Sequence, residues 1–181
     1  MAKKSQAGAA RSARAGRGAS AGGGPTTAAT VALAAAGVSF TAHTYVHDDS
    51  VTDFGAEAAR ELGLPAERVF KTLMVETDAG LGVGIVPVSD QLDLKALAAE
   101  LGAKKAAMAD RALAERKSGY VVGGISPVGQ KTPVTTVLDE SALAFDTILV
   151  SGGRRGFDVE LAPAELLRVV GGRAAPIRRA R

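Results

Sequence analysis

The alternation of apolar and polar positions along this chain predicts short helices and strands in an irregular order. Helices are expected where apolar residues recur at helical spacing between a capping residue and a glycine, over 27–36, 55–62, 93–101, 112–116 and 163–171. Strands are expected where apolar residues alternate with polar ones or form short runs, over 38–47, 68–76, 82–88, 106–108, 134–138, 147–150 and 157–161. Because regular strand–helix–strand repeats are lacking, the order predicts an α+β fold, with a curved mixed sheet or open barrel and helices packed on it.

Basic charge is concentrated at the two ends of the chain. The first 17 residues hold five Lys and Arg, the last nine hold four Arg, and no acidic residue precedes Asp48. The formal net charge of the chain is +3, so the remainder without these nine carries about −6. We divide the chain into a disordered basic tail (1–25), a folded domain (26–172) and a basic C-terminal tail (173–181). The N-terminal tail either contacts nucleic acid or is a solubilising extension.

Composition removes several classes of site. The chain contains no cysteine and no tryptophan, so disulfides, thiolate metal sites and a cysteine nucleophile are excluded, and the core must consist of Val, Leu, Ile and Ala. No apolar run is long enough to span a bilayer, and the N-terminus lacks the apolar segment of a secretory signal. We expect a soluble cytoplasmic protein.

Two histidines four residues apart, His43 and His47, raise the question of a metal site. They fall in a predicted strand, where four residues span about 13 Å, whereas ligands of one zinc ion each lie about 2 Å from it. We therefore expect surface or cleft-wall residues and no metal. The sequence also lacks a Ser-His-Asp elbow, a dinucleotide fingerprint and a pair of catalytic carboxylates, so an enzyme with this sequence has no obvious nucleophile of its own.

Lys71 is the most informative charged residue. Alternation in its strand places it beside Val69, Leu73 and Val75, on an apolar face. A lysine there is costly to bury unless it is paired or reaches water. Either Lys71 extends to water at the strand end, or its ammonium lies in a cleft and holds an anion or a carbonyl oxygen.

Two glycine-rich segments are further candidates for binding. Residues 119–131 combine glycines with a Ser-Pro turn, which predicts a rigid loop whose backbone groups face a ligand; the alternative is a tight corner between strands. Residues 151–156 could cradle a phosphate with N–H groups and two guanidiniums, or form an exposed hairpin turn.

Several of these segments occur in the order typical of one family. They are VFKTL at 69–73, QLDLK at 91–95, GYVVGGISP at 119–127 and VSGG at 150–153, with HTY at 43–45 and FG at 54–55. They resemble the YbaK/EbsC group of free-standing aminoacyl-tRNA editing proteins, relatives of the editing insertion in bacterial prolyl-tRNA synthetases. The resemblance runs from about Val31 to Val170 and does not include the basic tails.

The resemblance implies a fold and an activity. The fold is a mixed β-sheet closed into a partial barrel with flanking helices. The activity is removal of cysteine mischarged onto tRNA(Pro). Prolyl-tRNA synthetase rejects cysteine poorly because its side chain is close in size to that of proline, and a difference of about one methylene gives only about 10–200-fold discrimination. In the YbaK-type model the substrate's own thiol attacks its ester carbonyl, the tRNA leaves, and a cysteine thiolactone is released. No cofactor is implied.

The resemblance also implies site residues. Lys71 matches the family lysine that faces the terminal adenosine and its aminoacyl group. The loop of Gly123, Gly124, Ile125, Ser126 and Pro127 matches the family's Gly-x-x-x-Pro loop, whose backbone orients the aminoacyl group. Other matched positions line the pocket: Tyr45, Phe54, Thr72, Tyr120, Ser151 and Asp158.

Three functions remain open at this point. The first is a Cys-tRNA(Pro) deacylase, the second a deacylase of the same fold for another substrate such as Ala-tRNA(Pro), and the third a non-catalytic module that binds tRNA ends or nucleotides. The implied partners are the 3′ end of tRNA(Pro) and prolyl-tRNA synthetase, because free-standing editing of one tRNA needs a source of specificity.

Overall fold

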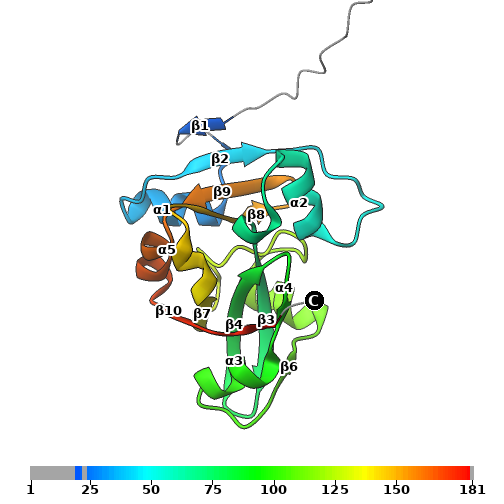
Figure 1. Cartoon of the computed structure of the whole chain (residues 1–181), viewed down its shortest axis with the longest axis vertical. Helices are drawn as coiled ribbons and strands as arrows, with labels where there is room; N and C mark the ends of the chain where they lie inside the picture. Colours follow the sequence, from blue (N-terminus) through cyan, green and yellow to red (C-terminus); the bar gives the residue numbers. More distant parts are fainter. Residues whose placement is uncertain (1–18, 22–23, 180–181) are drawn as a thin grey trace, which may run out of the picture.

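The computed structural model describes residues 19–21 and 24–179 as an α+β fold (Figure 1). The helices are α1 (Ala28–Ala35), α2 (Phe54–Leu62), α3 (Leu94–Glu100), α4 (Arg111–Ser118) and α5 (Pro163–Val170), with 3-10 turns η1 (Ala66–Arg68) and η2 (Glu140–Ala144). The strands are β1 (Ala19–Ala21), β2 (Thr41–Thr44), β3 (Phe70–Thr77), β4 (Gly80–Pro87), β5 (Gln91–Leu92), β6 (Ala106–Met108), β7 (Thr135–Asp139), β8 (Ile148–Arg154), β9 (Phe157–Leu161), β10 (Arg173–Ala175) and β11 (Arg178–Arg179).

The strands form separate sheets rather than a closed barrel. One sheet has the order β1-β2-β9-β8, a second has the order β10-β7-β4-β3-β6, and β11 pairs with β5. The second sheet is mixed, because β7 runs parallel to both β4 and β10. Strands of the two large sheets cross at a steep angle (Figure 1) and are joined by a single parallel bridge between Val69 and Leu149. The predicted partial barrel is therefore wrong: within the described residues β8 and β3 belong to different sheets and form no ladder, and the bridge between the sheets lies at Val69, just before β3.

Helix boundaries follow the predicted capping residues. Thr27 caps α1 in a reciprocal capping box with Thr30, while Asp53, Asp93 and Asp110 accept hydrogen bonds from the first turns of α2, α3 and α4. These side chains satisfy backbone N–H groups that have no partner inside the helix. The helix predictions are confirmed to within a few residues. The strands predicted over 68–76 and 82–88 are confirmed too, and they pair as the antiparallel hairpin of β3 and β4.

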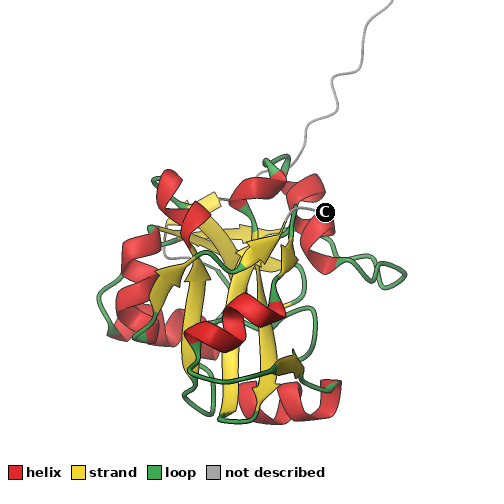
Figure 2. Ribbon diagram, turned by 60° about the horizontal axis from the view of Figure 1, so that its bottom comes forward, coloured by secondary structure: helices red, strands yellow, loops and turns green. Residues whose placement is uncertain are grey.

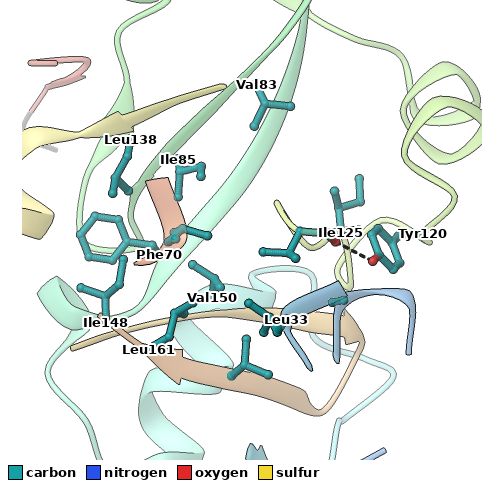
Figure 3. Packing of buried hydrophobic residues seen from close by; sticks show 14 of the residues in the cluster. Leu33, Phe70, Val83, Ile85, Tyr120, Ile125, Leu138, Ile148, Val150 and Leu161 are labelled. Carbon is teal, nitrogen blue, oxygen red and sulfur yellow. Dashed lines mark hydrogen bonds between the residues drawn. The ribbon is translucent and has the colours of Figure 1, made fainter. Parts of the chain in front are cut away.

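The main core fills the space between the two large sheets (Figure 3). Phe70, Ile85 and Leu138 from the second sheet meet Ile148 and Leu161 from the first, and all five side chains are buried. A second cluster lies on the opposite face of the second sheet, where Val75, Val86 and Ile177 pack with Leu97 of α3. Figure 2 shows the helices arranged around the strands. In the part of the chain that the structure describes, no helix is long and apolar enough to cross a membrane.

The ends of the chain differ from the sequence-based division. Residues 173–179, expected in a basic tail, contribute β10 and β11 to the sheets. At the other end, Ala19–Ala21 pair with β2, although residues 1–25 were predicted to be disordered. The rest of that predicted tail, 1–18 and 22–23, lies outside the described residues. The predicted strand 38–47 is also shorter, since β2 spans only Thr41–Thr44.

Asp139 attaches the C-terminal segment to the domain. Its buried carboxylate accepts backbone hydrogen bonds from Ile177 at 2.9 Å, Arg178 at 3.0 Å and Ser141 at 3.0 Å. The Nε atom of Arg178 lies 3.2 Å from the same carboxylate. Both oxygens of Asp139 therefore act only as acceptors, and the positive charge of Arg178 offsets the cost of burying them. This explains why the basic residues near the C-terminus join the fold.

We expect Asp139→Asn to lower the free energy of unfolding by about 3 kcal/mol, because the new amide NH₂ faces N–H donors and the half-exposed Arg178 loses its buried anionic partner. Urea denaturation followed by circular dichroism measures the change. Asp49→Asn is the matched control, since the Asp49 side chain is 98% exposed, and should change the free energy of unfolding by less than about 0.5 kcal/mol. Equal midpoints for the two variants would contradict this role of Asp139.

Candidate functional site

A cavity of about 370 Å³ opens where the two large sheets separate. Its wall includes residues of β3, the segment before α2, the start of α4, the glycine loop after α4, and the two strands β8 and β9. This volume lies at the small end of the range of about 300–1,000 Å³ for ligand pockets in proteins. The cavity therefore has room for the end of a larger substrate, not for a folded macromolecule.

The cavity lies beside a gap in the pairing of β3. One edge of β3 pairs with β4 along its whole length, but the other pairs with β6 only from Val75 onward. At the start of β3, the bridge between Val69 and Leu149 connects this other edge to β8. Between these two attachments lies Thr72, which lines the cavity and whose buried hydroxyl has no hydrogen-bond partner among the described residues. A buried hydroxyl without a partner is costly, which is a common mark of a ligand site.

Lys71 lines the cavity and is partly buried. Its ammonium donates a hydrogen bond of 2.7 Å to the backbone carbonyl of Asp90, a residue outside the cavity wall. Asp90 is itself paired with Arg178. In this structure the Lys71 ammonium is therefore bonded to the protein's own backbone, on a residue outside the cavity wall.

Asp158 is the buried acid of the cavity. It stands on β9 and is 6% exposed, and its carboxyl group makes no hydrogen bond or ion pair with any other described residue. Burial raises the pKa of its carboxyl group from 3.8 to about 7. Tyr45 lies in the same wall, and its pKa is raised first by burial and then by the negative charges of Asp158 and Glu57. The phenol therefore stays protonated, whereas Asp158 exchanges its proton near neutral pH.

The glycine loop closes one side of the cavity by close backbone contacts. Gly123 has a positive φ of 90°, and a Cβ atom there would lie 2.8 Å from the ring of Phe54. A Cβ atom on Gly124 would lie 2.7 Å from the Cα atom of Arg154. Only glycine allows the loop to pack this tightly against α2 and the β8–β9 turn. The loop is further fixed by Tyr120, whose hydroxyl donates to the carbonyl of Val128 at 2.7 Å (Figure 3).

The structure brings most of the predicted site residues to this one cavity. Eight line it: Tyr45, Phe54, Lys71, Thr72, Gly123, Ile125, Ser151 and Asp158. Four do not: Tyr120, Gly124, Ser126 and Pro127. Tyr120, Gly124 and Ser126 are buried away from the cavity, and Pro127 lines a separate hollow of about 170 Å³ beside β7 and α5. A motif match alone therefore does not place a side chain in the cavity.

Sequence reasoning missed the contribution of α4 and the segment before it. Met108, Ala109, Arg111 and Ala114 line the cavity, but three of them are apolar and a single arginine in the first turn of a helix is not a distinctive chemical signal. For residues 151–156 the sequence left open a phosphate cradle or a hairpin turn, and in the structure residues 155–156 form the turn between β8 and β9. The guanidinium of Arg155 lies 4.8 Å from the centre of the Phe54 ring and bonds the carbonyl of Val122, contacts that the sequence did not predict.

The two histidines bind different carboxylates. The Nε2 atom of His43 lies 2.7 Å from Glu160, and the Nδ1 atom of His47 lies 2.7 Å from the buried Glu57. His47 also packs against Phe54, with ring centres 5.6 Å apart. Over the described residues, no group of three or more His, Cys, Asp or Glu side chains is placed to hold a metal ion. Both histidines therefore support the wall of the cavity from outside it.

Known structures share this fold. A protein solved as a candidate trans-editing enzyme for prolyl-tRNA synthetase superposes with a TM-score of 0.73 at 24% identity, covering 87% of this chain and all of that one (100%). The hypothetical protein APE2540 superposes with a TM-score of 0.74 at 25% identity, covering 84% of this chain and 100% of that chain. At these identities the comparison supports the fold.

The sequence comparisons are more specific. A curated relative from Enterococcus faecalis (strain ATCC 700802 / V583), named as a candidate Cys-tRNA(Pro)/Cys-tRNA(Cys) deacylase, EbsC, is 41% identical over 120 residues, which is 66% of this chain and 73% of the relative. Residues 49–169 match the model of the aminoacyl-tRNA editing domain, and this stretch contains all the cavity residues discussed above except Tyr45. The chain therefore belongs to the aminoacyl-tRNA editing domain family.

Proposed function

We propose that this chain is a trans-editing deacylase that removes cysteine mischarged onto tRNA(Pro). The observation that carries the proposal is the cavity itself. It combines the buried acid Asp158, the unpaired hydroxyl of Thr72 and the backbone of Gly123, yet its wall contains no histidine or cysteine. Such a site can position an ester and manage a proton, while the nucleophile comes from the substrate. The name of the Enterococcus relative supports the same substrate class.

The proposed reaction is an intramolecular acyl transfer. The cysteinyl sulfur forms a bond to the ester carbonyl carbon, the bond from that carbon to the ribose oxygen breaks, and the thiol proton ends on the ribose oxygen. The products are a cysteine thiolactone and uncharged tRNA. Holding the thiol near the carbonyl supplies most of the acceleration, because positioned groups within one molecule react far faster than separate ones.

Asp158 is the proposed carrier of the thiol proton. A pKa of about 7 lets its carboxylate accept a proton from the thiol and return it to the leaving ribose oxygen at neutral pH. The hydroxyl of Thr72 is proposed to bond the ester or the ribose. Lys71, held by the carbonyl of Asp90, is proposed to stabilise negative charge on the substrate at the border of the cavity.

Two alternatives are separated from this proposal by substrate choice. An Ala-tRNA(Pro) deacylase would need an external nucleophile such as water, and a non-catalytic module would bind tRNA without cleavage. The proposed partner is prolyl-tRNA synthetase, since the cavity holds only the end of a tRNA and something else must select tRNA(Pro). The proposed place of action is the cytoplasm, where tRNA is charged.

We expect the full chain to deacylate Cys-tRNA(Pro) quickly and to leave Ser-tRNA(Pro) and Ala-tRNA(Pro) nearly intact, because only cysteine carries a thiol. Serine is the matched control, since it replaces sulfur by oxygen at almost the same size. Loss of the labelled ester over time measures each rate. Equal rates for alanine would exclude attack by the substrate's thiol, and no loss from any of the three would favour the binding module.

We expect Lys71→Ala to reduce deacylation of Cys-tRNA(Pro) by about 100-fold, the usual effect of removing one charge-stabilising donor. Circular dichroism should show that the fold is kept. Lys95→Ala is the matched control, because Lys95 is exposed on α3 and does not line the cavity. If Lys71→Ala retains full activity, the ammonium takes no part in the reaction.

Asp158 also makes stability depend on pH. Because burial raises its pKa from 3.8 to about 7, the folded chain binds a proton between these values that the unfolded chain has released. The free energy of unfolding that this group contributes therefore falls as pH rises through that window, and its full cost is present above pH 7.

We accordingly expect Asp158→Asn to be more stable than the unaltered chain at pH 8, on the order of 2 kcal/mol, with the difference vanishing toward pH 4. The same variant should lose deacylation because it cannot carry the proton. Urea denaturation at a series of pH values measures the effect, with the exposed Asp146→Asn as control. A constant difference between Asp158→Asn and the unaltered chain across this range would show that the carboxyl group titrates normally.

A further inference from the structure

Both backbone polar groups of Val122 are bonded to charged side chains from two different elements. Its N–H donates to the Oε1 atom of Glu115 on α4 at 2.9 Å. Its carbonyl accepts from Arg155 in the β8–β9 turn, from Nε at 3.0 Å and from Nη2 at 2.9 Å. Val122 and the following Gly123 line the cavity. Bonds on both sides of one residue fix the orientation of the two peptide groups that flank it.

Arg155 connects this loop to α2 as well. Its guanidinium lies 4.8 Å from the centre of the Phe54 ring, and the same ring is so close to Gly123 that a Cβ atom there would lie 2.8 Å from it. The planar guanidinium stacks on the ring and at the same time donates from Nε and Nη2 to one carbonyl oxygen, which the ammonium of lysine cannot do. Arg155, Phe54 and the Val122–Gly123 segment therefore form one packed unit at the cavity wall.

Glu115 supplies the opposite side of this arrangement. It accepts from the Val122 N–H, and its carboxylate also lies 3.1 Å from the Nε atom of Arg111, a residue of the cavity wall. The bond from Val122 and the charges of Arg111 and Arg155 hold the pKa of Glu115 below its ordinary range, so the carboxylate is ionised at neutral pH. An ionised acceptor makes the stronger hydrogen bond to a backbone N–H.

These contacts determine where the N–H of Gly123 points. The carbonyl of Val122 and the N–H of Gly123 belong to the same trans peptide group, in which the two bonds point in opposite directions. With the carbonyl fixed on Arg155, the N–H of Gly123 points away from Arg155, and it donates to no other described residue. A fixed backbone donor on a cavity-lining residue is the kind of group that stabilises an oxyanion.

We propose that Glu115 and Arg155 are positioning residues which hold the Val122–Gly123 peptide group so that its N–H donates to the ester oxygen on which negative charge develops. The inference rests on the proposed deacylase function. Neither side chain touches the substrate through its charge in this role. Both act through the loop, so geometry rather than net charge should decide their effect.

The neighbouring Arg154 provides a matched comparison. It is the last residue of β8, directly before Arg155, and carries the same charge, but it is exposed, whereas Arg155 is partly buried against the loop. An arginine that merely attracts tRNA would weaken binding when it is removed, and would do so at either position. An arginine that orients the loop would slow the chemical step at position 155 alone.

The test is single-turnover deacylation of Cys-tRNA(Pro) over a range of enzyme concentrations, with the full chain and the variants Arg155→Ala, Arg155→Lys and Arg154→Ala. We expect Arg155→Ala to lower the rate at saturating enzyme by about 100-fold with little change in the concentration at half saturation. Arg155→Lys keeps the charge but cannot reproduce the two bonds to the Val122 carbonyl together with the stacking on Phe54, so it should be slow as well. Arg154→Ala should keep the saturating rate. Equal saturating rates for Arg155→Ala and Arg154→Ala, or full activity of Arg155→Lys, would overturn the inference.

A second measurement does not depend on activity. Hydrogen exchange of the Val122 amide should become faster in Glu115→Ala and remain slow in Glu115→Gln, which keeps an oxygen acceptor, and the saturating rate should follow the same order. Unchanged exchange in Glu115→Ala would overturn the role of Glu115. Failure of the proposed function looks different: the unaltered chain would then deacylate none of the charged tRNAs. If the unaltered chain is active and Arg155→Ala is equally active, only the present inference fails.

Discussion

The structure depends on the interruption in strand pairing along one edge of β3. A sheet edge is normally paired, covered or blunted, because its free N–H and C=O groups would otherwise bind another chain. Here β8 touches the edge at Val69 and β6 takes over at Val75, and the stretch between them borders the cavity. Had the two sheets closed into a barrel, this edge would be satisfied and no cavity would open beside it. Incomplete closure therefore leaves room for the cavity in which we propose that the substrate binds.

The buried acids differ in whether their carboxylates have hydrogen-bond or ion-pair partners. Among the residues that the structure describes, four acids are buried: Glu57, Asp90, Asp139 and Asp158. Glu57 is bonded to His47 and to a backbone N–H, and Asp90 is paired with Arg178. Asp139 accepts from three backbone N–H groups. Asp158 alone has none, and it alone lines the cavity. A buried carboxylate without a partner destabilises the folded chain, which is expected where a site needs a perturbed pKa and unexpected in a scaffold.

Local structure could be predicted from the sequence because its causes are local. The caps Thr27, Asp53, Asp93 and Asp110 each act within one turn of the chain, and the hairpin of β3 and β4 needs only its turn. Most of the residues that the family motifs predicted for the site also line one cavity. The edge gap, by contrast, depends on partners about 35 to 80 residues away, and no local pattern specifies them. The C-terminal segment was misjudged for the same reason, since its basic residues are anchored by Asp139 from β7.

Arg155 shows most clearly what sequence alone leaves open. Two arginines beside glycines are compatible with a phosphate cradle. In the structure, however, the guanidinium of Arg155 bonds the carbonyl of Val122 and stacks on the ring of Phe54. That use fits an enzyme without a nucleophile of its own. When the attacking atom belongs to the substrate, the protein can accelerate the reaction only by fixing geometry and by stabilising charge where it develops. A mobile glycine loop could not fix geometry or stabilise charge. The conformational freedom that lets Gly123 approach Phe54 therefore has to be restricted by side chains outside the loop, here Glu115 and Arg155. On this argument the rigidity of the wall, more than any single reactive group, is the catalytic property of the site.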